Sequence, residues 1–177
     1  MNLKTIADID VSKESYDYNF QTYLTDKLDN LDWDFSQDIL NEIILWKVNR
    51  YALFDEDTIK LLNKLDRNSK KIDKDFTIKL LWKLLNTKWV QLAMATTILR
   101  FKNPFIYQII DQRVYRFIYW KEMDRIVWKN NLAIELYLDY LEKLWEICIK
   151  YNVNFEESDR VLYALDKKLN KKVKIKY

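Results

Sequence analysis

The sequence predicts an all-α protein, one compact domain of about seven or eight helices that spans residues 1–177. Three observations indicate this class. Apolar residues recur at spacings of three and four along most of the chain. Alternating polar and apolar runs bounded by turn residues, which would indicate strands, are nearly absent. No linker rich in proline, glycine or serine divides the chain, and 177 residues are enough to bury a substantial core.

The expected helices follow one another closely along the chain. The clearest is the long stretch 132–151, in which one continuous apolar stripe has the helical spacing. The stripe is formed by Ile134, Tyr137, Leu141, Leu144, Cys148 and Tyr151. The other expected helices lie within residues 16–31, 34–51, 55–67, 75–86, 90–101 and 154–170, and one more follows Asp111.

Several helix ends are also indicated by residue type. Asp34 or Ser36 is a suitable N-cap for the second helix, because a short side-chain oxygen accepts a hydrogen bond from a free amide. Asn86 and Asn103 are the expected stops of the two middle helices. In a chain without glycine, asparagine is the natural residue for the left-handed position after a helix.

The composition excludes several classes of enzyme. The chain contains no glycine, where an average chain of this length has about a dozen, and no histidine. It therefore has no Gly-rich phosphate loop, no Ser-His-Asp triad and no histidine-based zinc site. The single cysteine, Cys148, cannot form an internal disulfide and is expected to pack in its helix. We expect no metal and no cofactor.

The two ends of the chain and its charge bear on its location and partners. The start carries acids without an apolar core, unlike a signal peptide, and no apolar run reaches the ~18 residues of a membrane span, so a cytoplasmic protein without membrane contact is expected. Residues 1–15 are expected to be loosely held. The net charge is only +3, but residues 171–177 form a basic tail in which Lys171 and Lys172 are candidate phosphate contacts. The alternative for this tail is a frayed, solubilising terminus.

Three separated segments carry a resemblance to a known group of proteins. They are residues 39–51, with Trp46, Lys47 and Arg50; residues 90–116, with a proline-bearing turn before an acid; and residues 152–170, with Asp159-Arg160. Together they resemble a widespread group of uncharacterised bacterial proteins related to the helix-hairpin-helix DNA glycosylase superfamily (HhH-GPD). The resemblance implies a DNA-glycosylase-like fold and makes DNA the expected partner, and it says nothing of a protein partner.

Within the second segment, residues 110–116 resemble the superfamily pattern [VI]-D-x-x-[VI]-x-R. The acid of that pattern is catalytic, so the resemblance implies Asp111 as the candidate catalytic residue. In such enzymes a flipped nucleotide presents its glycosidic bond to this carboxylate, which stabilises positive charge on the sugar. Arg113 and Arg116 become candidate nucleic-acid contacts, as do Lys88 and Gln91 in the segment that corresponds to the hairpin.

The chain also departs from the superfamily pattern. In the hairpin segment 87–95, Trp89 and Gln91 replace two glycines that let backbone amides approach a DNA phosphate. Ala93 replaces the lysine of the lyase members, so Schiff-base chemistry is not expected, and the cysteine spacing of an iron–sulfur cluster is absent. Binding to DNA is therefore expected to be weak and sensitive to salt.

The residues leave alternatives open at each candidate position. Asp111 can serve only as a helix cap, or can pair in the interior with Arg113 or Arg116, the outcome we expect, with its carboxylate partly accessible. Arg50 is expected to form a buried pair with an acid. Five tryptophans at helical spacing are expected in the core, although indoles also stack on bases; they are Trp82, Trp89, Trp120, Trp128 and Trp145.

The function therefore has two main interpretations. The first is recognition or excision of a base in DNA through a lone aspartate. The second is a catalytically inactive relative that acts as a nucleic-acid-binding or protein-interaction module. A third class is an interaction module in a bacterial or phage conflict system. Whether the chain is an enzyme is open at this stage.

Overall fold

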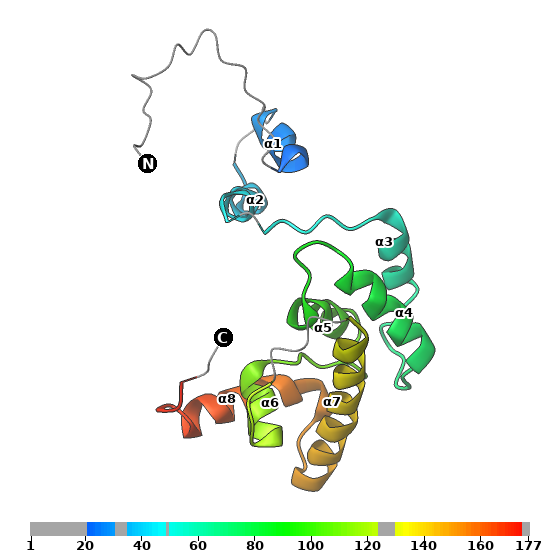
Figure 1. Cartoon of the computed structure of the whole chain (residues 1–177), viewed down its shortest axis with the longest axis vertical. Coiled ribbons are helices and arrows are strands. Elements are labelled where there is room, and N and C mark those ends of the chain that lie inside the picture. The colour runs from blue at the N-terminus through cyan, green and yellow to red at the C-terminus, as the bar shows by residue number, and fades with distance from the viewer. Residues whose placement is uncertain (1–20, 31–34, 49, 124–129, 175–177) are drawn as a thin grey trace, which may run out of the picture. The chain divides into compact units, whose positions relative to one another are not determined.

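The computed structural model describes residues 21–30, 35–48, 50–123 and 130–174, and every regular element within these ranges is a helix (Figure 1). The all-α class is confirmed. The described residues form eight α-helices and one short 3-10 helix: α1 (Thr22–Asp29), α2 (Gln37–Lys47), α3 (Glu56–Asn63), α4 (Lys74–Leu85), α5 (Leu92–Lys102), α6 (Gln112–Tyr119), α7 (Asn130–Tyr151), η3 (Phe155–Glu157) and α8 (Ser158–Leu169). Residues 1–15, Trp128 and the tail beyond residue 174 lie outside the described ranges.

The chain divides into two compact units, residues 1–51 and 52–177, where the sequence predicts one domain. In the first unit α1 packs against α2. The indole of Trp46 donates a hydrogen bond to the Thr25 hydroxyl at 2.9 Å. Ser36 caps α2, as predicted, by accepting a hydrogen bond from the amide of Ile39. Arg50 is exposed and forms no ion pair with any described residue, so the expected buried pair at this position is wrong.

The second unit is built around α7. The apolar stripe of α7 is buried as predicted, except at its end, where Tyr151 is exposed. Helices α4 and α6 pack against α7, and α8 lies beside α6 (Figure 1). Cys148 is buried in this stripe, and its burial raises the pKa of the thiol. The core between these helices contains mostly leucine, isoleucine and tyrosine side chains from α4 to α8.

Helix ends occur where asparagine was predicted, but the backbone conformations differ. Asn86 follows α4 with right-handed geometry, and Asn103 follows α5 with an extended backbone at φ −147°. Asn103 instead uses its side chain, which donates hydrogen bonds to the carbonyls of Asp66 and Ser69. The described residues with left-handed backbone are Gln21, Trp89, Trp120 and Asn152. Sequence reasoning assigned none of these four to a left-handed position.

Four of the five tryptophans that were expected in the core lie within the described residues, and for all four the expectation is wrong. Trp82, Trp89 and Trp145 are 46 to 50% exposed, and Trp120 is 93% exposed. Helix α4 shows the reason, since its buried side is already filled by Thr77, Leu80, Leu81 and Leu84. The indole of Trp82 is left outside that stripe and is accessible to solvent.

Candidate functional site

Asp111 is the N-cap of α6, as the sequence predicts. Its backbone is extended, and one carboxylate oxygen accepts a hydrogen bond from the Arg113 amide at 2.7 Å. The segment 105–110 before it contains no strand, in agreement with the prediction that a proline-bearing turn leads directly to this helix. The side chain is partly buried and partly accessible. Asp111 therefore presents a carboxylate at a helix N-terminus, where free amides and the helix dipole favour negative charge.

Buried hydroxyl groups hold the segment that leads to Asp111. Tyr137 and Tyr140, one turn apart on α7, donate hydrogen bonds to the carbonyls of Gln108 and Ile109 at 2.9 and 2.8 Å. On the other side, the amide of Ile110 donates to the hydroxyl of Thr96 on α5 at 3.3 Å. Two helices thus fix the backbone immediately before the acid, so the position of Asp111 is set by the core.

The tyrosines in this arrangement predict a loss of stability in alkali. Burial raises the pKa of Tyr137 and Tyr140 well above the usual value of 10.0. Above about pH 10 the unfolded chain releases these protons while the folded chain retains them, so stability falls as pH rises. We expect denaturant midpoints to decrease steeply above that pH. The variant Tyr137→Phe/Tyr140→Phe should show a shallower decrease, and equal slopes for the two proteins would contradict the interpretation.

Arg113 and Arg116 pair with Asp166 of α8, so the predicted interior pairing with Asp111 is wrong. Arg116 donates to the two oxygens of Asp166 at 2.9 and 2.8 Å, and Arg113 donates at 3.3 Å. Asp166 is completely buried. Burial alone would raise the pKa of its carboxyl, but the hydrogen bonds from Arg116, Asn170 and Arg113 outweigh burial and lower the pKa below 3.8. Both arginines are thus used to join α6 to α8.

The remaining candidate contacts are on the surface. Lys88 and Gln91 are exposed in the turn between α4 and α5. Within this turn Trp89 has φ 71°, a left-handed backbone that glycine adopts more readily. Lys171 and Lys172 are exposed just after α8, and Arg116 anchors the base of this tail by donating to the Val173 carbonyl at 3.1 Å.

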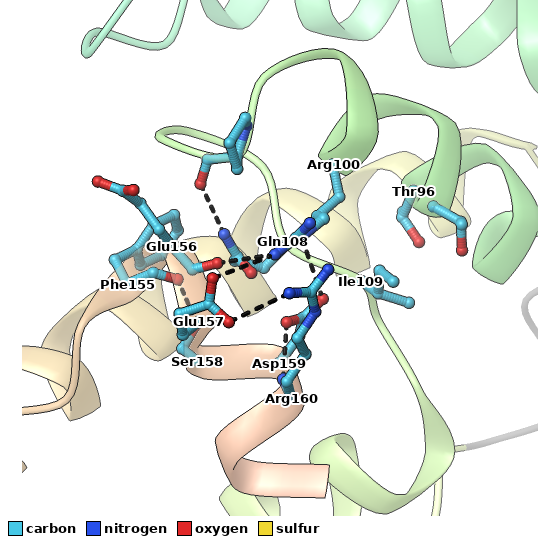
Figure 2. Close-up of polar contacts among 12 residues, drawn as sticks. Thr96, Arg100, Gln108, Ile109, Phe155, Glu156, Glu157, Ser158, Asp159 and Arg160 are labelled. Atoms are coloured by element: carbon cyan, nitrogen blue, oxygen red, sulfur yellow. Dashed lines mark hydrogen bonds and ion pairs between the residues drawn. The ribbon is translucent and has the colours of Figure 1, made fainter.

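Asp159 lies in the first turn of α8, which begins at Ser158. Figure 2 shows the Arg100 side chain of α5 reaching toward η3 and the first turn of α8, beside Gln108. Arg100 donates to the Glu156 carbonyl at 3.0 Å, and its Nε lies 3.7 Å from an oxygen of Asp159. Both side chains are buried. Among the described residues, neither this Nε nor this oxygen has a hydrogen-bond partner.

Sequence reasoning missed two features of this unit. Asp166 follows Leu162 by four residues and therefore lies on the buried side of α8, which is the signal of a buried acid. Lysines spaced four apart, Lys60 and the C-cap Lys64 of α3 and Lys79 and Lys83 of α4, are the signal of a basic face.

Comparisons with known proteins give no relative for this chain: no family model, curated protein or solved structure matches it significantly. Among the described helices, none is long and apolar enough to cross a membrane. Within the same residues no group of three or more acidic or cysteine side chains is placed to hold a metal ion.

Proposed function

We propose that this protein recognises or excises a base in DNA, as a relative of the helix-hairpin-helix DNA glycosylases, with Asp111 as its catalytic acid. The observation that carries the proposal is the placement of Asp111. A partly accessible carboxylate lies at a helix N-terminus, on a backbone held by hydroxyl groups of α5 and α7. Rigid positioning of one charged group is what stabilisation of a developing sugar cation requires.

The turn between α4 and α5 supports the same proposal. Helix α5 begins at Leu92, after this turn, and four residues later it supplies the Thr96 hydroxyl that binds the segment before Asp111. One helix therefore connects a hairpin with exposed Lys88 to the backbone that carries the acid. The left-handed Trp89 gives the turn a backbone conformation that fits a glycine of the superfamily pattern.

The same turn also favours a second candidate function, binding without excision. The superfamily has glycines at this turn, which let backbone amides come close to a phosphate. In this chain Trp89 corresponds to one of those glycines, and its indole is about half exposed. Lys88 lies over this ring, its ammonium 5.3 Å from the ring centre. Phosphate contact at this turn would then depend on the lysine rather than on backbone amides.

Substitution of Asp111 separates chemistry from capping. Asp111→Asn keeps a cap of similar quality, so we expect no change in the unfolding midpoint, whereas Asp111→Ala should cost ~1 kcal/mol. If the carboxylate is catalytic, both variants should lose base release from duplexes that carry damaged or modified bases, measured as abasic product. Full release by Asp111→Asn would contradict a catalytic role. DNA binding by wild type without release from any duplex would favour the second candidate function.

A further inference from the structure

Helices α3 and α4 form two adjoining open grooves on the surface of the second unit. One groove, of about 590 Å³, ends at the turn after α4, where Thr87 and Lys88 line it. The other, of about 650 Å³, continues along α3. Lys79 and Lys83 of α4 line both grooves, so the two form one continuous surface, which we call the α3–α4 groove.

The α3–α4 groove is strongly basic. Its lining contains five lysines, at positions 60, 64, 79, 83 and 88, against two aspartates, Asp55 and Asp57. The carboxylate of Asp55 already caps α3 by accepting from the Thr58 amide, and Lys60 pairs with Glu56. No described residue forms an ion pair with the other four lysines. The excess of three positive charges equals the net charge of the whole chain.

The lysines lie in rows, and an aromatic ring lies beside them. Lys60 and Lys64, and likewise Lys79 and Lys83, are four residues apart, a spacing that places each pair on one side of its helix. The indole of Trp82 lines the same groove and is 48% exposed. A basic track with an accessible aromatic ring is the combination by which proteins bind single-stranded nucleic acid, with lysines at the phosphates and the ring under a base.

We propose that the α3–α4 groove binds a single-stranded segment of nucleic acid, with the lysines at its phosphates and Trp82 stacked on one base. A single strand suits this groove better than a duplex, because only an unstacked base can lie on the indole. The inference rests on the proposed function for its ligand class, but it requires no chemistry at Asp111. Because one end of the groove lies at Lys88, the bound nucleic-acid strand extends from the α4–α5 turn along α3.

The test uses the full chain and a fluorescein-labelled oligothymidylate of ~16 nucleotides, with binding followed by anisotropy. Lys64→Gln/Lys79→Gln/Lys83→Gln removes three phosphate contacts, so the slope of log affinity against log salt should become about 2 units less steep. Trp82→Leu should weaken binding about 5-fold to 150-fold and leave the salt slope unchanged, because stacking involves no counterion release. The matched control, Lys71→Gln/Lys143→Gln/Lys150→Gln, removes the same charge from lysines that line neither groove, and should keep the wild-type slope.

Several results would overturn this inference. The first is that the wild type does not bind the oligonucleotide at low salt. The second is that the groove triple variant keeps the wild-type salt dependence of binding. The third is that the control triple variant reduces the salt dependence as much as the groove variant does. Wild-type affinity in Trp82→Leu, or a preference for duplex, would overturn the single-strand assignment. If the groove variant still releases the base and still binds the oligonucleotide, the groove would be refuted as the binding site, and the proposed function would stand. Lost strand binding in that variant, without base release by wild type, would support the groove and refute excision.

Discussion

Asp166→Asn should lower the free energy of unfolding by about 3–5 kcal/mol at neutral pH, because it removes the buried carboxylate that accepts hydrogen bonds from two arginines. Asp166 is completely buried and accepts hydrogen bonds from both Arg113 and Arg116. The neutral amide that replaces it cannot compensate the two guanidinium charges. Urea denaturation followed by circular dichroism measures the change. Asp139→Asn, which removes an exposed acid from α7, is the matched control and should be nearly neutral.

The effect of this substitution should also depend on pH, with a defined sign. The pKa of Asp166 is lowered from its usual 3.8 in the folded protein, so its stabilising contribution is present above that value. It is lost as pH falls through the lower pKa of the folded state, where the carboxyl takes up a proton. Asparagine does not titrate, so the difference between wild type and Asp166→Asn should narrow below about pH 4. A difference that stays constant into acid would contradict the ion-pair interpretation.

Arg100→Met should also cost about 3–5 kcal/mol, because it leaves the buried Asp159 carboxylate without its cation. The ion pair is too long for a hydrogen bond, since Nε of Arg100 and the nearest carboxylate oxygen of Asp159 are 3.7 Å apart. Neither atom has a hydrogen-bond partner among the described residues. Removal of both charges in Arg100→Met/Asp159→Leu should therefore restore most of the lost stability, since apolar groups of similar size need no compensation.

A double-mutant cycle of thermal or urea unfolding measures this coupling. Arg160→Met is the control, because Arg160 makes an exposed pair with Glu157 three residues away and should contribute little. If the double variant is no more stable than Arg100→Met alone, Asp159 stabilises α8 through a contact other than the one with Arg100. Its hydrogen bond with the Arg160 amide, at 2.6 Å, would then be the first contact to test.

The helices could be predicted from the sequence because each one buries a stripe of apolar side chains, and these residues recur every three or four positions. The caps Ser36 and Asp111 could be predicted for the same local reason, since both act on amides within three residues. The boundary near residue 51 could not be predicted, because no change in composition accompanies it. The exposure of Trp82 depends on how much of the buried stripe the leucines of α4 already fill, and residue type alone does not determine this.

Part of the candidate site was predictable for similar reasons. The approach to Asp111 depends on Thr96 and on two tyrosines of α7, which lie far from it in sequence, so no local pattern indicates their contacts. The partner of Arg113 and Arg116 is separated from them by about 50 residues, which is why a nearby acid was the expected partner. The lysine spacing on α3 and α4 was visible in the sequence, but the groove between them required the fold.

The left-handed backbone at Trp89, Trp120 and Asn152 has a consequence for the unfolded chain. Holding a residue with a β-carbon in that conformation costs about 1–2 kcal/mol, and these residues carry the cost because the chain has no glycine to place there. The same absence restricts the denatured ensemble, since each glycine replaced at a compatible position lowers the entropy lost on folding by about 0.4–1 kcal/mol. With about a dozen fewer glycines than an average chain, the stiffer denatured state offsets the strain at the helix ends.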